Sequence, residues 1–279
     1  MKTMMRPLLE DWQFGVLGIY NYRRRGKLQH YYSFIMENCK HLEGDIIEAG
    51  VYNGKSLLAT GLLLADFKSD KTVYGFDSFK GFPPEFHKND YADKFVGLCA
   101  DGRITEQHLD FVKLNNTYVD ALLSSKSCQV REKAMNDILK TSASACPSTI
   151  STSGNFSDVD WHILLRKMDM LELNNVILVP GFFEDTMTIE YPEHMQIDKI
   201  MAALLDCDLY LSYKTALPFL WDRLVQGGYI FIDEYYSLKY PGPMIAVDEF
   251  FEDKKNKPQK HVHEWGQFER WYVKKTHEE

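Results

Sequence analysis

The sequence predicts an α/β fold built on a mainly parallel sheet. Two short apolar segments, 45–50 and 72–77, flank a helical segment at 56–67. A strand, a helix and a strand within about thirty residues form the unit that joins two parallel strands. The same alternation resumes from Trp161 onward. With 279 residues, of which 45% are hydrophobic, the chain suffices for one large domain or for a domain with an insertion.

The segments on either side of this unit follow other patterns. Apolar residues spaced by three or four over the first forty residues predict helices packed on the domain. We therefore separate an N-terminal helical segment, 1–43, from a domain at 44–279. Residues 86–160 lack strand patterns and predict an insertion, which could cover the active site as a lid. Its expected elements are helices at 105–123 and 130–139 and a Ser- and Thr-rich loop at 142–157.

The second half of the chain predicts four further strands. They are expected at 175–179, 199–206, 228–233 and 268–274. The helices expected among them are at 161–173, 210–224 and 244–251. Pro218 lies inside the second of these helices and should kink it.

The composition disfavours several classes of function. A formal charge of −8 and a pI near 5.6 argue against binding to nucleic acids, because an acidic chain repels phosphate. Five cysteines without a C-x-x-C pair indicate free thiols in a reducing compartment. There is no leader pattern and no run of about 18 apolar residues. We expect a cytoplasmic protein that binds neither membranes nor nucleic acids and that could form a homo-oligomer.

The first candidate ligand-binding motif is the segment at the end of the first strand, 48–56 (EAGVYNGKS). Its glycines allow a sharp turn and a close approach of the backbone to a ligand, and the next helix directs free N–H groups to the same place. The motif is not G-x-G-x-x-G, so a dinucleotide is not expected. An acid and two glycines suit a cationic nucleoside such as S-adenosylmethionine, although a simple tight turn would use the same glycines.

Two further segments at strand ends could bind the rest of such a nucleoside. Asp77 ends the second strand, where an acid can accept hydrogen bonds from a ribose diol; capping of the next segment is the alternative. Residues 180–186 (PGFFEDT) follow the third strand and could enclose an adenine ring with their aromatic side chains. Taken alone, this third segment is better explained as a loop with core aromatics.

Four acids at the ends of two strands give the sharpest prediction. Asp206 and Asp208 end the fourth strand, and Asp233 and Glu234 end the fifth. Adjacent parallel strands bring their carboxyl ends together, so these side chains should converge. Clustered carboxylates are costly unless they are protonated or neutralised by a cation, and oxygen ligands suit Mg²⁺ or Ca²⁺. Hydrated acids that cap the following helices are the alternative.

Five blocks of the sequence resemble the macrocin O-methyltransferase family and occur in that family's order. The blocks are 44–56 (GDIIEAGVYNGKS), 75–83 (GFDSFKGFP), 180–186 (PGFFEDT), 205–212 (LDCDLYLS) and 227–235 (GGYIFIDEY). The resemblance covers 44–84 and 175–252, a little under half the chain. It implies a class I methyltransferase fold, which is a Rossmann-like seven-stranded sheet, mostly parallel, with an antiparallel last strand. It also implies methyl transfer from S-adenosylmethionine to a hydroxyl, usually with Mg²⁺.

The resemblance assigns roles to the residues at the matching positions. The cofactor would be bound by Glu48, Gly50, Val51, Tyr52, Gly54, Ser56, Asp77, Ser78, Gly181, Phe182, Phe183 and Asp206. The metal ligands would be Asp206, Asp233 and Glu234. Asp208 would be the nearby base, although the sequence leaves open which of Asp206 and Asp208 ligates and which removes the proton. The chain departs from the family in having Asp-Glu where Asp-Asp is common, and in its long insertion.

These observations predict an enzyme that methylates a hydroxyl of a small molecule, with a sugar or a glycosylated natural product as the expected acceptor. A metal-dependent methyltransferase of the catechol or phenol type is the nearest alternative. A non-catalytic S-adenosylmethionine-binding protein of the same fold is another. A nicotinamide dehydrogenase is disfavoured because its glycine motif is absent, and a serine hydrolase because no G-x-S-x-G occurs.

Overall fold

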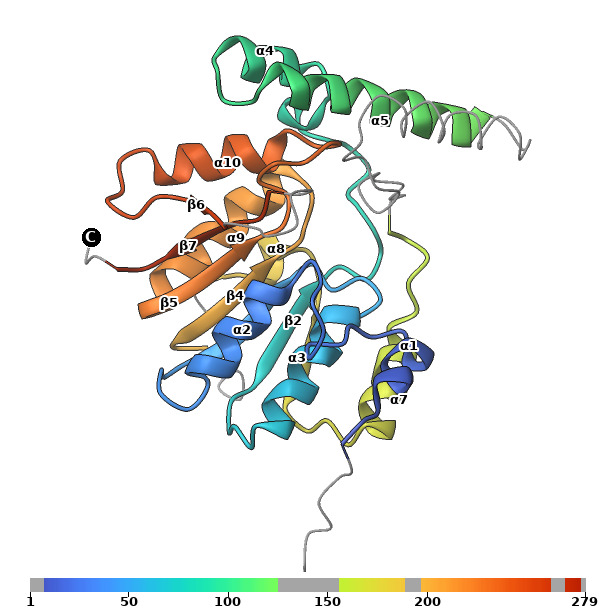
Figure 1. Cartoon of the computed structure of the whole chain (residues 1–279), viewed down its shortest axis with the longest axis vertical. Helices are drawn as coiled ribbons and strands as arrows, with labels where there is room; N and C mark the ends of the chain where they lie inside the picture. The colour runs from blue at the N-terminus through green and yellow to red at the C-terminus, as the bar shows by residue number, and fades with distance from the viewer. Residues whose placement is uncertain (1–7, 125–155, 189–196, 262–268, 277–279) are drawn as a thin grey trace, which may run out of the picture.

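The central feature of the molecule is a seven-stranded sheet with the order β3-β2-β1-β4-β5-β7-β6 (Figure 1). A computed structural model describes residues 8–124, 156–188, 197–261 and 269–276. The strands are β1 (Asp45–Ala49), β2 (Val73–Asp77), β3 (Val176–Pro180), β4 (Ile200–Leu205), β5 (Leu224–Ile232), β6 (Gln259–Lys260) and β7 (Trp271–Lys274). Strand β7 runs antiparallel to both of its neighbours, and the other pairs are parallel. The predicted fold class is therefore confirmed.

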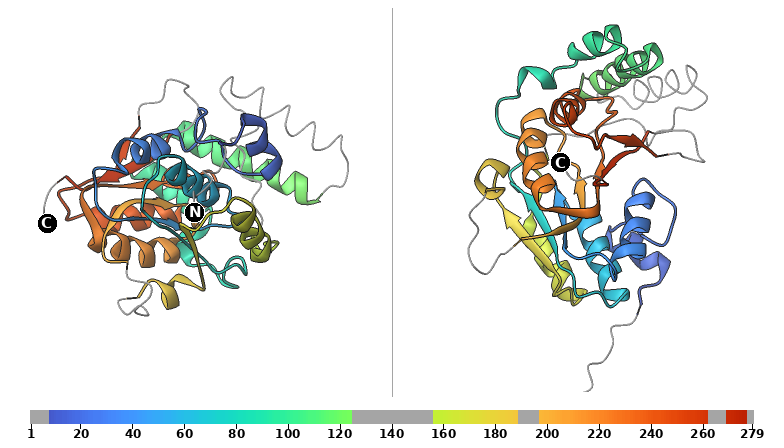
Figure 2. Two further views of the ribbon diagram at one scale, coloured as in Figure 1. Left: turned by 90° about the horizontal axis from the view of Figure 1, so that it is seen from below. Right: turned by 90° about the vertical axis from the view of Figure 1, so that its left-hand side faces the viewer.

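Helices cover both faces of this sheet. One apolar cluster joins the sheet to α1 (Asp11–Leu17), α2 (Gln29–Asn38), α3 (Lys55–Asp66) and α7 (Trp161–Met170). A second joins it to α8 (Phe183–Thr186), α9 (Tyr210–Arg223) and α10 (Gly242–Phe251). Figure 2 shows the blue N-terminal helices and the orange C-terminal helices on opposite sides of the strands. Neighbouring residues such as Ile46 and Ile47 enter different clusters, as expected for a strand buried on both faces.

Three helical elements lie in the first part of the predicted insertion. They are η1 (Lys88–Asp90), α4 (Lys94–Ala100) and α5 (Glu106–Ser124). Helices α4 and α5 share a third apolar cluster with Met244 of α10 and stand beyond that helix at the top of Figure 1. The helix predicted at 105–123 is confirmed by α5. The helix predicted at 130–139 and most of the loop predicted at 142–157 lie outside the described residues.

The structure differs from the prediction at several element boundaries. Helix α1 ends at Leu17 because Gly18 adopts a left-handed conformation with φ of 65°, and 18–28 then cross to α2 without a helix. Strand β5 begins at Leu224, directly after α9 and four residues before the predicted start. Helix α9 continues through Pro218 to its end. Strand β6 has two residues, too few to show a period of its own.

The carboxyl ends of the central strands meet at one edge of the sheet. Backbone hydrogen bonds continue beyond the strands, from Asp206 N to the Ala49 carbonyl at 2.9 Å and from Asp233 N to the Leu205 carbonyl at 2.9 Å. These bonds hold the loops after β1, β4 and β5 side by side, so side chains distant in sequence reach one place. Among the described residues, no helix has the length and apolarity that crossing a bilayer requires.

Candidate active site

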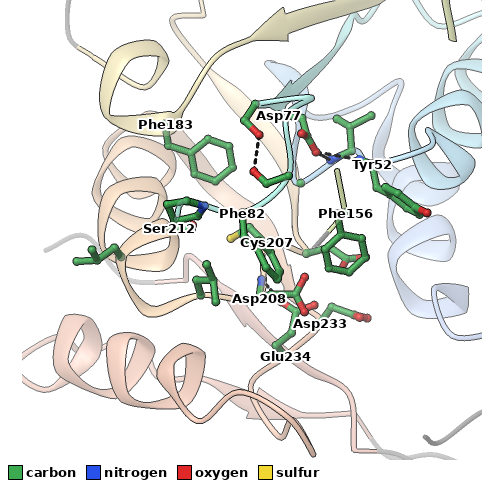
Figure 3. A pocket seen from close by; sticks show the side chains of 18 of the residues that line it. Tyr52, Asp77, Phe82, Phe156, Phe183, Cys207, Asp208, Ser212, Asp233 and Glu234 are labelled. Carbon is green, nitrogen blue, oxygen red and sulfur yellow. Dashed lines mark hydrogen bonds between the residues drawn. The ribbon is translucent and has the colours of Figure 1, made fainter. Parts of the chain in front are cut away.

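A cavity of about 760 Å³ opens at this edge of the sheet. Its walls include the segments that follow β1, β2, β3, β4 and β5, together with Lys27 and Tyr20 from the N-terminal segment. Figure 3 shows Asp77 and Tyr52 on one side of it and Asp208, Asp233 and Glu234 on the other. The structure thus brings together the five sequence blocks that were singled out as ligand-binding segments.

Both glycines of the 48–56 loop are required by the backbone. Gly50 has φ of 95°, and a Cβ there would lie 1.8 Å from the carbonyl oxygen of Asp206. Gly54 has φ of 73° and precedes α3, and a Cβ there would lie 2.4 Å from a methyl carbon of Leu164. Only Gly50 of the two lines the cavity. The left-handed backbone and the close packing are therefore enough to explain why glycine occurs at both positions, whether or not a ligand binds there.

Asp77 ties the first loop to the turn after β2. Its Oδ2 accepts hydrogen bonds from Val51 N at 2.8 Å and Tyr52 N at 2.9 Å, and its Oδ1 accepts one from Phe79 N at 2.7 Å. Ser78 stays within the same turn, where its hydroxyl donates to the Gly81 carbonyl at 2.8 Å. A carboxylate offers about four lone-pair positions, so Asp77 retains capacity to accept from a ligand in the cavity.

Glu48 lies beneath this loop instead of on the cavity wall. Its carboxyl is fully buried and accepts a hydrogen bond from Ser56 Oγ at 2.7 Å, while Oε2 has no hydrogen-bond partner among the described residues. Burial raises the pKa of Glu48 well above its ordinary value. Ser56, by contrast, does line the cavity. Of the predicted cofactor-binding residues, Glu48 and Gly54 are the two that do not line it.

The segment after β3 contributes two aromatic side chains of different character. Phe182 precedes α8 and is 37% exposed, whereas Phe183 is buried in the second apolar cluster. Both line the cavity together with Gly181. Phe183 therefore packs in the core, as the alternative interpretation of this segment expected. The side chain of Phe182 is exposed enough to contact a ligand.

The acids after β4 and β5 converge as the sequence predicts. Asp206, Asp208 and Glu234 each present a carboxylate oxygen within 4.8 Å of the others. Tyr213 of α9, which is fully buried, donates a hydrogen bond to Glu234 Oε2 at 2.6 Å. Asp208 has φ of 61°, an uncommon value for a non-glycine residue, and its backbone N–H donates a long hydrogen bond to Glu234 Oε2 at 3.5 Å. The resemblance assigned Asp206, Asp233 and Glu234 to the metal and left open which of Asp206 and Asp208 ligates.

Asp233 is held by two cations instead. Its Oδ2 lies 3.2 Å from Lys27 Nζ, and its Oδ1 lies 3.7 Å from an Arg270 guanidinium nitrogen. Lys27 Nζ also lies 3.4 Å from Asp206 Oδ2. Burial opposes ionisation of Asp233, but Lys27 and Arg270 outweigh it and lower the pKa of this carboxyl.

For Asp208 the charges of Lys239 and Lys27 offset the effect of burial only in part, and Glu234 lies among carboxylates. Burial, followed by the charge of Asp206, raises the pKa of Asp208 to about 7. Burial and the neighbouring carboxylates of Asp206 and Asp208 raise the pKa of Glu234 well above its ordinary value. Shifts of this kind arise where like charges gather away from solvent, and they are common at functional sites. The arrangement can accept a proton at Asp208 and can bind a hard cation between its oxygens.

Several residues of the cavity were not found by sequence reasoning. They are Tyr20, Lys27, Phe82, Phe86, His87, Asp90, Phe156 and Arg270. Phe82 packs edge to face with Phe86 and Phe156 at ring distances of 5.9 and 5.0 Å. Lys27 follows the basic run Arg23–Arg25 after one glycine, a pattern that is usually a solvated surface turn and does not point to a buried site. Arg270 lies in the segment predicted as the last strand. Which way its side chain points depends on the register in which that strand pairs with its neighbour, and the sequence does not give that register.

The sheet order, its single antiparallel strand and the loops gathered at one edge define a class I methyltransferase fold. Solved structures that share it include two natural-product methyltransferases. The O-methyltransferase NovP covers 88% of this chain and 80% of its own, with a TM-score of 0.54 and 20% identity. CalS11, a calicheamicin methyltransferase, covers 95% and 80%, with a TM-score of 0.53 and 17% identity.

The chain belongs to the macrocin O-methyltransferase (TylF) family, whose sequence model matches residues 3–110 and 161–271. The unmatched residues between these ranges fall within the predicted insertion at 86–160. Demethyldecarbamoylnovobiocin O-methyltransferase of Streptomyces niveus is 26% identical over 211 residues, which are 75% of this chain and 59% of that protein. Mycinamicin III 3''-O-methyltransferase of Micromonospora griseorubida is 24% identical over 229 residues, 82% of this chain and 67% of that one. The chain thus spans 59% of the length of the first of these relatives.

Proposed function

We propose that this chain is an S-adenosylmethionine-dependent O-methyltransferase that uses a divalent metal, Mg²⁺, to methylate a hydroxyl of a small molecule. The observation that carries the proposal is the carboxylate cluster of Asp206, Asp208 and Glu234, which shares one cavity with the glycine-containing loop after β1. Membership of the family supports the reaction type. The names of the two relatives describe O-methyl transfer to demethyldecarbamoylnovobiocin and to mycinamicin III, which supports a glycosylated natural product or a sugar as acceptor.

The cofactor would lie between the loops after β1, β2 and β3. S-adenosylmethionine supplies the methyl group when it is bound there. Gly50 lines the cavity, and its left-handed turn would bring the backbone of the first loop close to the amino-acid part of the cofactor. The free lone pairs of Asp77 would accept hydrogen bonds from its ribose, and Phe182 would cover its adenine. Asp77 also keeps the first loop in place, so one carboxylate would both bind the ribose and position the loop after β1.

The donor set of the cluster fits a divalent metal of the Mg²⁺ type. All of the candidate ligand atoms are carboxylate oxygens, and burial together with neighbouring carboxylates raises the pKa of Asp208 and of Glu234. Asp206 and Glu234 of the cluster would hold the ion together with Asp233, whose Oδ2 shares the Lys27 ammonium with Asp206 Oδ2, and Asp208 would be left as the base. Such an ion lowers the pKa of a bound hydroxyl and orients it.

Asp208 would remove the proton from the acceptor hydroxyl. In the metal-free protein burial and the charge of Asp206 raise the pKa of Asp208 to about 7, which makes it a stronger proton acceptor than an ordinary carboxylate, and a bound ion would keep it ionised, as a base requires. Asp208 lines the cavity, and its carboxylate lies within 4.8 Å of that of Glu234. The aromatic side chains of the cavity would exclude water from the reacting atoms.

A phenol is the second candidate acceptor, and the aromatic wall of the cavity favours it. Phe82, Phe86 and Phe156 form an apolar surface that a flat ring could contact. Incubation of the protein with labelled S-adenosylmethionine and equal concentrations of sugar-bearing and catechol-bearing acceptors separates the two. Label in the catechol alone would refute the sugar acceptor.

The first test is calorimetric titration with S-adenosylhomocysteine, with and without Mg²⁺. The variants are Asp233→Asn and, as a control, Glu249→Gln, which alters an exposed carboxylate that pairs with Lys214 outside the cavity. We expect all three proteins to bind the nucleoside, and wild type and Glu249→Gln to bind Mg²⁺ more tightly than Asp233→Asn. Absence of nucleoside binding in wild type would refute the proposed function. Nucleoside binding without a metal signal would refute the metal alone.

A further inference from the structure

Lys27 places a positive charge inside the acidic cluster from a remote part of the chain. It belongs to the segment 18–28, which crosses from α1 to α2, and it lines the cavity. Its Nζ lies 3.4 Å from Asp206 Oδ2 and 3.2 Å from Asp233 Oδ2, so one ammonium bridges two carboxylates. Both acids are also among the ligands proposed for the divalent ion.

The segment that carries Lys27 is anchored along its length. Tyr20 N donates to the carbonyl of Lys55 at 3.1 Å, at the start of α3. Arg23 pairs with Asp66 at 3.1 Å near the end of the same helix. Leu28, directly after the lysine, is buried with only 2% of its surface exposed. The backbone that carries Lys27 is therefore fixed against the domain, so the ammonium is positioned at the cluster by the fold.

Two cations have to share the same oxygens if a divalent ion binds here. A divalent ion on Asp206 and Asp233 would stand within a few ångströms of an ammonium on the same two carboxylates, and like charges at that distance in a part-buried site repel strongly. Arg270 contacts the other oxygen of Asp233, so that carboxylate keeps one cation if Lys27 withdraws. Lys27 is thus the cation that an incoming ion displaces.

We propose that Lys27 is a tethered competitor of the divalent ion: it neutralises Asp206 and Asp233 when no ion is bound and leaves them when one binds. The inference rests on the proposed function, because it takes the metal site as given there. It follows that the affinity for metal is set partly by the N-terminal segment. It also follows that ion binding releases the end of 18–28 and reshapes the wall of the cavity near Tyr20.

The test compares the affinity for Mg²⁺ of wild type, Lys27→Gln and Lys27→Arg by calorimetry. Lys199→Gln is the matched control, because Lys199 also pairs with a carboxylate, Glu43 at 2.6 Å, but does so outside the cavity. If the ammonium holds the site about nine-tenths of the time, its removal tightens binding about tenfold. We expect that gain for Lys27→Gln alone, with Lys27→Arg and the control close to wild type. Equal or weaker binding by Lys27→Gln would overturn the proposal.

Hydrogen exchange gives a readout that does not depend on activity. On addition of Mg²⁺, the amides next to Lys27 at the end of 18–28 should exchange faster in wild type and should not respond in Lys27→Gln; slower or unchanged exchange of these amides in wild type would overturn the proposal. Thermal unfolding of each variant establishes that it is folded, and Lys27→Arg retains the charge if Lys27→Gln is unstable. Binding of S-adenosylhomocysteine is measured in the same samples. If that nucleoside binds but no protein binds Mg²⁺, the competition is refuted and the methyltransferase proposal stands.

Discussion

Binding of Mg²⁺ to this protein should release protons, in an amount that depends on pH. The raised pKa of Asp208, about 7, means that about 0.9 of these carboxyls carry a proton near pH 6 and about 0.1 near pH 8. A divalent ion held by its neighbours favours the ionised form, so the proton leaves as the ion binds. This group alone should make the apparent affinity about tenfold tighter near pH 8 than near pH 6. Glu234, whose pKa is also raised, adds to the release.

The assay is calorimetric titration with Mg²⁺ in two buffers of different ionisation enthalpy, repeated near pH 6 and near pH 8. The difference in heat between the buffers gives the number of protons released, which should be about one or more at the lower pH and clearly smaller at the higher. Asp208→Asn is the control, because it removes this titrating group. Equal affinities and no proton release at the lower pH would show that the acids are already ionised and would refute the reasoning.

The same shift has a consequence for stability without metal. A carboxyl whose pKa is higher in the folded than in the unfolded protein stabilises the fold only while it is protonated. Below the unfolded pKa its contribution is fully present, and it is lost as the pH rises through the folded pKa of about 7. The free energy of unfolding of the metal-free protein should therefore fall between about pH 4 and pH 7 and recover on addition of Mg²⁺.

Three substitutions test single features of the site. Asp208→Asn should lower turnover by about 10² to 10⁴-fold while leaving binding of S-adenosylhomocysteine intact, and unchanged turnover would remove Asp208 as the base. Gly50→Ala should destabilise the fold by at least about 1–3 kcal/mol in urea unfolding, because its Cβ would lie 1.8 Å from the Asp206 carbonyl; a wild-type midpoint would contradict the close contact. Tyr213→Phe should cost about 1–3 kcal/mol, because buried Glu234 loses its donor at 2.6 Å, and a neutral effect in the same assay would show that this bond is dispensable.

Most of the sheet could be predicted because parallel strands buried on both faces are continuous apolar runs. Strands β1, β2 and β4 lie within a residue or two of their expected positions. The elements that were missed have weak local signals. Helix α4 is seven residues long and contains Gly97, and strand β6 consists of only two residues. The early start of β5 was missed because Leu224 was assigned to the preceding helix, and β5 begins there directly after α9.

The sequence predicted which residue types form the candidate site, but not which side chains form hydrogen bonds and ion pairs with one another. Acids at strand ends must converge in a parallel sheet, so the neighbourhood of Asp206, Asp208 and Glu234 followed from the sequence. The same reasoning treated Asp77 as a ribose ligand and did not foresee that it would accept from the backbone of the first loop. It also gave Asp233 to the metal without its partner Lys27, which lies 206 residues away in the chain.

By itself, the sequence determined the sheet of alternating strands and helices, the glycines of the first loop and the acids at the strand ends. Each of these is written in a few consecutive residues, because hydrophobic periodicity and backbone freedom act locally. Only the tertiary structure decided which carboxylate meets which cation, and therefore that Asp233 is ionised by Lys27 and Arg270 while Asp208 keeps a raised pKa. Charge interactions and desolvation depend on distances through space, and those distances exist only once the N-terminal segment has folded against the sheet.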